Sequence, residues 1–346
     1  MRSATQWFSA VLLAGAIAGC GAAPQERESD LRVGYFPNLT HAQALVGMAD
    51  GSFKNALGDK GTIKPFIFNA GPAVIEALFA GGLDLAYIGP NPAINGYVRS
   101  GGTALKIIAG ATSGGAVLVV RPELHIQQPK DFAGRKIATP QLGNTQDVAL
   151  RHYLLEHQLQ TQDKGGSVQV IPMQNPDILT ALVKKEIDGA WVPEPWGARL
   201  IVEGAGELFL DERTLWPGGK FVTANVIART KFLREHPELV KRWLRAHVEV
   251  TEWIAAHPEE AKTLLNREIE NYTGKKLKAD VLNQAWSRLE SAYDPLAGTL
   301  FTAADAGFSL GFLGKTKPDL SGLYDVTLLN QVLLEKKLPA VSVKKE

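Results

Sequence analysis

The chain has 346 residues, of which 45% are hydrophobic and 21% are charged. This length exceeds one ordinary domain and fits two lobes of roughly 100–200 residues each, and the composition supports packed cores rather than disorder. With 37 basic and 36 acidic residues and no long run of either sign, the sequence excludes the basic footprint of a nucleic-acid-binding protein. The single cysteine, Cys20, excludes a disulfide framework and a cysteine-based zinc site.

The first twenty residues have the pattern of an export signal. Arg2 is followed by an apolar run over 7–18 and by small residues before Cys20. This apolar stretch is too short to span a bilayer as a mature helix. A cysteine at the expected cleavage point resembles a bacterial lipobox, which implies removal of residues 1–19 and lipid modification of Cys20. An ordinary signal peptide with a chance cysteine is the alternative. Residues 20–30 are predicted to form a flexible tether.

Two parts of the chain resemble each other when the sequence is shifted by 104 residues. Each copy has the pattern of strand, polar loop, strand, proline-started helix, tight turn and strand. Such alternation indicates two similar lobes, each a mostly parallel sheet flanked by helices. The aligned pairs are Val33-Gly34 with Ile137-Ala138, Pro72 with Pro176, Leu83-Asp84 with Ile187-Asp188, and Ala86-Tyr87-Ile88 with Ala190-Trp191-Val192.

The pattern changes in the second half of the chain. Residues 221–228 are typical of an extended segment, and helices dominate from Thr230 onward. An apolar stripe with helical spacing predicts one long amphipathic helix there. These helices have no counterpart in the repeat, so we expect them to pack outside lobe one. The stripe consists of Leu239, Trp243, Val250 and Ile254.

Three segments, residues 71–92, 177–196 and 232–250, carry a resemblance to a known family. The chain resembles the substrate-binding proteins of ABC importers in the nitrate, taurine and aliphatic sulfonate group, over residues 31–338. The resemblance implies an α/β, two-lobed type II periplasmic-binding-protein fold, in which each lobe is a mostly parallel sheet flanked by helices. It also places extra C-terminal helices on lobe one.

The same resemblance implies where the chain passes between the lobes, near residues 116–121 and 223–228. Lobe one then comprises residues 31–117 and 225–346, and lobe two comprises residues 118–224. Closure about these crossings is hinge motion, which ligand contacts from both lobes favour.

Loops at the carboxyl ends of the strands are expected to meet in the cleft between the lobes. A small oxyanion needs donors with little net charge, and helix N-termini supply such donors. We interpret Asn91 as an N-cap with Pro92 as the first helical residue. Ordinary helix capping is the alternative role for each asparagine, serine or threonine at these starts. The predicted ligand-binding residues are Asn38, His41, Gly89, Asn91, Ser113, Gly114, Asn144, Thr145, Glu194, Trp196 and Asn225.

The turn around Glu194 combines two tryptophans with two prolines. By resemblance, this loop contacts the organic part of the ligand. Glu194 is expected to pair with a ligand amine or with a donor of lobe one, a solvated turn carboxylate being the alternative. Trp191 lies inside a strand pattern and is interpreted as a core residue.

The resemblance implies capture of a small anion by lobe closure and its delivery to an ABC permease. An aliphatic sulfonate or taurine-like compound is ranked first because of the tryptophan-rich loop; nitrate, bicarbonate or a thiamine precursor remain alternatives. A small-molecule enzyme on the same fold is the alternative from another class. His152 and His157 are five residues apart and share no helix face, so no metal site is predicted.

No catalytic residue and no cofactor is predicted, because the sequence has neither a Gly-x-Ser-x-Gly turn nor a phosphate-binding loop. We expect a monomer without nucleic-acid partners, which contacts the membrane only through the lipid on Cys20. The expected location is the periplasm or the outer face of the cell membrane, with outer-membrane sorting left open.

Overall fold

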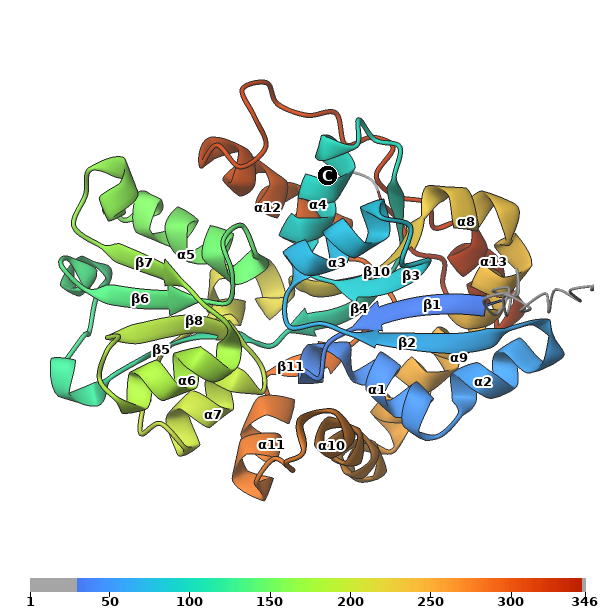
Figure 1. Ribbon diagram of the computed structural model, residues 1–346, viewed down its shortest axis with the longest axis horizontal. Coiled ribbons are helices and arrows are strands. Elements are labelled where there is room, and N and C mark those ends of the chain that lie inside the picture. The colour runs from blue at the N-terminus through green and yellow to red at the C-terminus, as the bar shows by residue number, and fades with distance from the viewer. Residues whose placement is uncertain (1–29, 344–346) are drawn as a thin grey trace, which may run out of the picture.

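The computed structural model describes residues 30–343, so the predicted signal peptide, Cys20 and the tether up to residue 29 lie outside the described residues. Two sheets form the centres of two lobes (Figure 1). The prediction of a two-lobed α/β fold is confirmed.

The first sheet has the order β11-β4-β10-β3-β1-β2, and its strands are β1 (Asp30–Tyr35), β2 (Thr62–Ile67), β3 (Leu85–Ile88), β4 (Leu105–Gly114), β10 (Val222–Arg229) and β11 (Leu289–Ser291). The second has the order β7-β6-β8-β5-β9, and its strands are β5 (Ala116–Val120), β6 (Lys136–Thr139), β7 (Gln169–Pro172), β8 (Gly189–Pro193) and β9 (Glu207–Asp211).

Helices bury both faces of each sheet. The first sheet packs on one face against α1 (Ala42–Ala49), α2 (Ser52–Leu57), α8 (Thr230–Glu235), α9 (Pro237–Ala256), α10 (Pro258–Thr273), α11 (Ala279–Trp286) and α13 (Thr327–Glu335). Its other face packs against α3 (Gly71–Phe79), α4 (Pro90–Arg99) and α12 (Ala297–Ser309). The second sheet lies between α6 (Asn175–Val183) and α7 (Trp196–Val202) on one side and α5 (Thr145–Glu156) on the other.

The two sheets are built on the same plan. In each sheet, three neighbouring strands are parallel to one another (β2-β1-β3 and β7-β6-β8). The next strand, β10 or β5, runs antiparallel to them. In the order of the sheets, β2, β1, β3, β10 and β4 correspond to β7, β6, β8, β5 and β9. The lobes are therefore structural copies of one another, as the sequence repeat predicts.

The repeat extends to one pair of aspartates. The Asp84 carboxylate accepts a hydrogen bond from the Arg32 backbone N–H at 3.0 Å, and Asp188 accepts from the Lys136 N–H at 2.8 Å. Each carboxylate also holds an arginine at the end of the antiparallel strand of its sheet. Arg229 donates to Asp84 at 2.7 Å and Arg121 donates to Asp188 at 2.6 Å.

The chain changes sheets at a pair of glycines. β4 ends at Gly114 and β5 begins at Ala116, with φ of 74° at Gly114 and 79° at Gly115, a region that favours glycine. A Cβ on Gly114 would lie 2.7 Å from the Arg288 carbonyl oxygen, so a side chain does not fit. The return passage lies between β9 and β10, over residues 212–221. The lobe boundaries at 117/118 and 224/225 remain predictions. The strands that enter the other sheet begin slightly before them, β5 at Ala116 and β10 at Val222.

The C-terminal helices do more than cover lobe one. The predicted stripe of α9 is buried, and its Trp243 ring stacks on Phe53 with a centroid distance of 3.7 Å. However, α11 also contacts α7 and α12 also contacts α5, both in lobe two. These two helices therefore bridge the lobes on opposite sides of the molecule (Figure 1). The sequence pattern predicted only that they pack outside lobe one.

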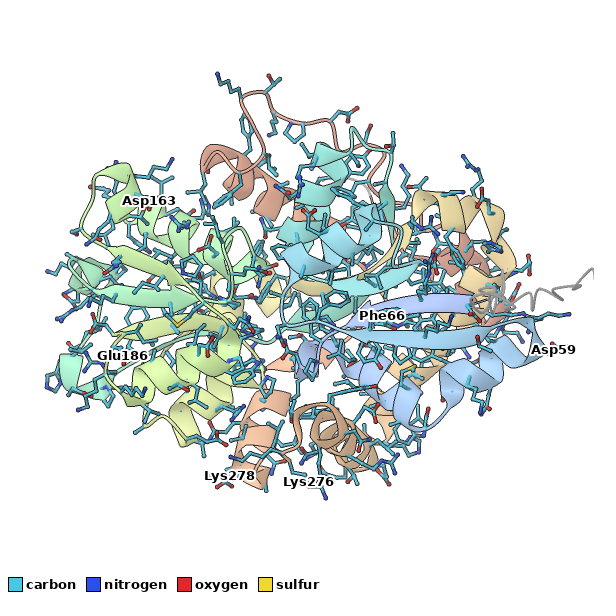
Figure 2. The ribbon with its side chains drawn as sticks, viewed as in Figure 1. Asp59, Phe66, Asp163, Glu186, Lys276 and Lys278 are labelled. Atoms are coloured by element: carbon cyan, nitrogen blue, oxygen red, sulfur yellow. The ribbon has the colours of Figure 1, made fainter. Side chains whose placement is uncertain are left out.

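Charged side chains mark the outer ends of the molecule, with Asp59 at the end of lobe one and Glu186 at the end of lobe two (Figure 2). Over residues 30–343, every helix is either too short or too polar to cross a membrane.

We predict that Asp84→Asn destabilises the protein by about 3 kcal/mol, because it leaves Arg32 and Arg229 half-buried without their shared carboxylate. Asp188→Asn is expected to cost less, since the Asp188 side chain is 15% exposed and that of Asp84 is 1% exposed. Equilibrium urea unfolding of both variants checks this order. An equal loss in the two variants would contradict it.

Candidate functional site

A small cavity, here called the polar cavity, lies where the two lobes meet. Its volume is about 20 Å³, which is about the space that one water requires. Residues from both lobes form its walls. They are Phe36, Asn38, Thr40, His41, Asn69, Gly89, Asn144, Thr145, Gln146, Asn175, Pro193 and Thr223.

The N-cap residues of four helices, taken from both lobes, line this cavity. The N-cap of the 3-10 helix η1 (Leu39–His41) is Asn38, that of α1 is His41, that of α4 is Gly89 and that of α5 is Asn144. None of these four helix starts has a side-chain capping hydrogen bond. The capping alternative for Asn38 and Asn144 is therefore not realised. In α5 the backbone N–H groups of the first turn stay available, together with the positive end of the helix dipole. In α4 only Asn91 can donate from the first turn, because Pro90 and Pro92 have no N–H.

The lining of the polar cavity carries no formal charge among the described residues. It holds no Asp, Glu, Lys or Arg, and its one titratable side chain is His41. Burial lowers the pKa of His41 to about 3, so the ring is neutral at physiological pH. Its Nδ1 accepts the Phe36 N–H at 3.2 Å, which leaves the proton on Nε2. His41 is therefore an uncharged donor.

Asp147 fixes the loop in front of α5. Its carboxylate accepts from the Thr139 hydroxyl and the Gly143 N–H, both at 2.9 Å. Arg151 lies 3.2 Å from the same carboxylate and offsets its charge. The loop that carries Asn144 and Thr145 is thus held rigid without leaving a net negative charge at the helix start.

Three polar contacts join the lobes around the polar cavity. The Trp196 Nε1–H donates to Asn38 Oδ1 at 3.1 Å, and Asn69 Nδ2 donates to Gln174 Oε1 at 3.1 Å. Glu194, fully buried just after β8, lies 2.7 Å from Arg288, which precedes β11 in the first sheet. The molecule is therefore closed over the cavity, because each contact links a lobe-one residue to a lobe-two residue.

The structure brings part of the predicted site together. Five predicted residues line the polar cavity: Asn38, His41, Gly89, Asn144 and Thr145. Trp196 lies next to it through its bond to Asn38. Their roles toward a ligand stay a prediction.

Other predicted residues lie elsewhere. The Glu194 carboxylate accepts hydrogen bonds from Arg288 and from the Ala198 N–H. Its contact with Arg288 is the predicted pairing with a donor of lobe one. Ser113 lines surface hollows beside β11, and Gly114 forms the crossing. The interpretation of Asn91 as an N-cap is wrong, because α4 begins at Pro90 with Gly89 as its N-cap.

Some of the buried polar atoms that lack a partner belong to the cavity or to β10 beside it. Thr145 Oγ1 and Asn175 Oδ1, both in the lining, have no hydrogen-bond partner. Asn225 is fully buried on β10, and neither of its side-chain polar atoms has a partner. An unpaired buried polar group costs roughly 1–3 kcal/mol, so these side chains have hydrogen-bonding capacity left that a group in the cavity could satisfy.

Sequence reasoning placed the loops at the strand ends in the cleft but did not select several residues that line the cavity. Asn69 and Asn175 lie on the equivalent loops of the two repeats, so the repeat itself carried the signal that selects them. Thr40, Gln146 and Thr223 adjoin predicted residues, and no motif distinguishes them from ordinary helix and strand positions.

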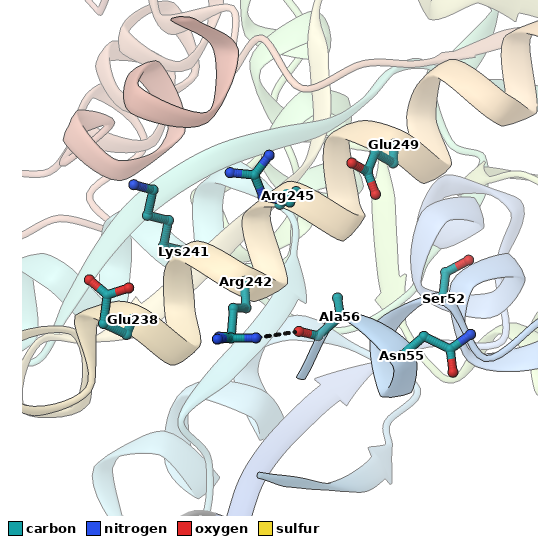
Figure 3. Close-up of a pocket in the computed structure, with 8 residues that line it drawn as sticks. All are labelled: Ser52, Asn55, Ala56, Glu238, Lys241, Arg242, Arg245 and Glu249. Carbon is teal, nitrogen blue, oxygen red and sulfur yellow. Dashed lines mark hydrogen bonds between the residues drawn. The ribbon is translucent and has the colours of Figure 1, made fainter. Parts of the chain in front are cut away.

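A larger hollow, which shares no residue with the polar cavity, lies on the surface between α2 and α9 (Figure 3). Its cations are already satisfied. Lys241 and Arg245 pair with Glu335, and Arg242 donates to the Ala56 carbonyl at 3.3 Å. Over residues 30–343, no three His, Cys, Asp or Glu side chains gather as they would around a metal ion.

Two copied α/β lobes with an uncharged polar cavity between them define the class of two-lobed solute-binding folds. Residues 24–267, well over half of the chain, match the NMT1-like family. The protein belongs to the NMT1-like family.

Two relatives extend this result. A Brucella abortus (strain 2308) protein named "Putative binding protein" is 32% identical, over 63% of this chain and 62% of its own length. The alignment thus spans less than two thirds of that relative. A Bacillus subtilis (strain 168) protein named "Putative aliphatic sulfonates-binding protein" is 26% identical over 92% of this chain and 94% of its own length.

A solved structure supports the fold over most of the chain. The alkanesulfonate-binding protein SsuA of Xanthomonas axonopodis pv. citri, solved bound to MOPS, superposes with a TM-score of 0.69 and 17% identity. The superposition covers 84% of this chain and 96% of that one. The two chains share a fold.

We predict that His41 makes the protein acid-sensitive. The unfolded imidazole takes up a proton below its ordinary pKa of 6.5, whereas the buried ring stays neutral down to about pH 3. Stability from this group is therefore present above pH 6.5 and falls by about 1.4 kcal/mol per pH unit as the pH drops toward 3. His41→Asn keeps an acceptor for the Phe36 N–H and removes the titration. Urea unfolding at pH 7.5 and pH 4.5 should show a smaller loss for the variant than for wild type. Equal losses would contradict the assignment.

Proposed function

We propose that the protein is the extracytoplasmic solute-binding component of an ABC importer and that it binds a small oxyanion, an aliphatic sulfonate or taurine-like compound, in the polar cavity. The observation that carries the proposal is the convergence of uncapped helix starts from both lobes on a cavity without charged side chains. Backbone N–H groups and helix dipoles stabilise an anion at such a place.

The chemistry of the lining supports a monoanion. Neutral amides, hydroxyls and the His41 Nε2–H provide hydrogen bonds without a full positive charge. A multiply charged anion would leave excess negative charge buried, which is costly. A sulfonate has three acceptor oxygens and one charge, and the names of the Bacillus and Xanthomonas proteins point to the same class.

Binding rather than catalysis fits the described lining. His41 is its one titratable side chain, and burial keeps this ring from accepting a proton at neutral pH. A general base has to gain a proton near the working pH. The site therefore supports reversible capture, with no chemical step on the ligand.

Lobe movement is part of the proposal. A cavity of about 20 Å³ does not admit a whole sulfonate from solvent, so the lobes open for entry and close over the ligand. The glycine pair at the crossing provides one hinge point. We propose a permease as the partner of the closed form, a monomeric body, and a lipid on Cys20 as the anchor to the outer face of a membrane.

The first test measures thermal unfolding of the full chain with ethanesulfonate, taurine, nitrate, bicarbonate, sulfate and a thiamine pyrimidine. A ligand at about 100 times its Kd adds about 2.7 kcal/mol, which moves the midpoint by a few degrees. We expect a shift with the two sulfonates. Asn144→Ala should weaken ethanesulfonate binding about tenfold, because a hydrogen bond to a charged group is lost.

The matched control is Asn55→Ala, which removes an exposed asparagine on α2 and should bind like wild type. A shift with nitrate or bicarbonate alone would discard the sulfonate and keep the oxyanion site. Turnover of any compound in the panel would contradict the binding function.

A further inference from the structure

Gly89 and Thr145 bring the two lobes into direct contact between two cavities. Gly89 directly follows β3 in lobe one, Thr145 is the first residue of α5 in lobe two, and both line the polar cavity. Thr145 also lines a second cavity between the lobes, of about 330 Å³, whose wall in lobe one includes Pro90. The contact of Gly89 with Thr145 is therefore part of the wall that separates the two cavities.

The space at Gly89 is too small for a side chain. A Cβ there would lie 2.3 Å from Thr145 Oγ1, well inside an ordinary contact distance. The next neighbours, Thr145 Cβ at 3.4 Å and the Thr223 carbonyl oxygen at 3.5 Å, would be in ordinary contact. The hydroxyl of Thr145 is thus the one atom that conflicts with a methyl group at residue 89. Turning this hydroxyl away is disfavoured, because β-branched side chains are restricted about χ1 in a helix.

The backbone of lobe one does not require a glycine at this position. Gly89 has φ of −69° and ψ of 158°, an extended conformation that any residue adopts. As the N-cap of α4 it supplies no side chain to the first turn, whereas serine, asparagine or aspartate would cap the helix. Local structure therefore leaves the choice of glycine unexplained, and the approach of lobe two explains it.

The sequence repeat supports the same conclusion. At the offset of 104 residues, Gly89 corresponds to Pro193 and Thr145 corresponds to His41, and all four residues line the polar cavity. The position equivalent to Gly89 thus carries a ring in lobe two. The plan that the lobes share does not demand a residue without a side chain at this strand end.

We propose that Gly89 and Thr145 form a steric stop of lobe closure. The lobes close until the Thr145 hydroxyl meets the bare Cα of Gly89, and this contact sets the width of the polar cavity. The inference rests on the lobe movement in the proposed function, and it holds for any anion that binds. The hydrogen bond of Asn69 with Gln174 joins two flexible side chains, which adjust to small changes of distance. Backbone against a short, β-branched side chain lacks this freedom.

A methyl group at residue 89 is then a wedge between the lobes. An ordinary contact with Thr145 Oγ1 requires that the lobes move apart by about 1 Å. Hydrogen bonds between the lobes, such as that of Trp196 with Asn38 at 3.1 Å, lengthen by a similar amount and are lost. The wedge therefore favours the open form without touching the core of either lobe.

The test is a double-mutant cycle on the full chain with Gly89→Ala, Thr145→Ala and both changes together. Each variant also carries Cys20→Ser and Asn175→Cys, which place a single thiol in the lining of the polar cavity. The readout is the rate at which 5,5′-dithiobis(2-nitrobenzoate) modifies this thiol. A cavity of about 20 Å³ excludes the reagent, so the rate reports how often the lobes are open.

We expect Gly89→Ala to raise this rate about tenfold when residue 145 is threonine. When residue 145 is alanine, the conflicting hydroxyl is gone, and Gly89→Ala should leave the rate nearly unchanged. The matched control is Gly298→Ala on α12, where a Cβ would meet nothing within 4 Å, and it should keep the parent rate.

Two results would overturn the steric stop. One is an unchanged rate in Gly89→Ala. The other is an equal rise with threonine and with alanine at residue 145, which is what an altered start of α4 alone would produce. Titration calorimetry of wild type with ethanesulfonate separates this inference from the proposed function. If ethanesulfonate binds and the cycle shows no coupling, the steric stop is overturned and the function stands. If no anion of the panel binds, the function is overturned, and the cycle still decides on the stop.

Discussion

Each sheet of this protein is completed by a strand that reaches it from the other lobe. The antiparallel strand β5 enters the second sheet directly from the first, and β10 enters the first sheet only after the second is complete. Asp84 and Asp188 secure the ends of these strands by binding Arg229 and Arg121. The chain therefore crosses twice between the sheets, and these two crossings set how the lobes face each other. The helix starts of both lobes are therefore held facing one gap.

The repeat made much of this architecture predictable. An offset of 104 residues aligned Asp84 with Asp188, and these two residues make the same backbone contact in the two lobes. A repeat carries such information because the same pattern of strands and helices folds twice in the same way. Contacts between the lobes lie outside any repeat. The partner of Glu194 is 94 residues away at Arg288, and no local pattern indicates that pairing.

The helix starts show where local rules fail. Gly89-Pro90-Asn91-Pro92 offers two prolines, each compatible with a first helical position, so the sequence alone does not decide between Gly89 and Asn91 as N-cap. Asparagine at the starts of η1 and α5 is typical of a cap, yet neither side chain caps its helix. Departures from a local rule are expected where a residue has another task, and both asparagines face the gap between the lobes.

The contacts between the lobes determine how much binding free energy a ligand has to contribute to keep the lobes closed. The pairs Trp196 with Asn38, Asn69 with Gln174 and Glu194 with Arg288 hold the closed arrangement. A ligand shifts the balance only by the difference of its affinity for the closed and open forms. The unpaired Thr145, Asn175 and Asn225 side chains oppose this arrangement, because they are buried in it without hydrogen-bond partners. Under the proposed function, a ligand that satisfies these side chains in the closed form removes this cost and so gains affinity for that form.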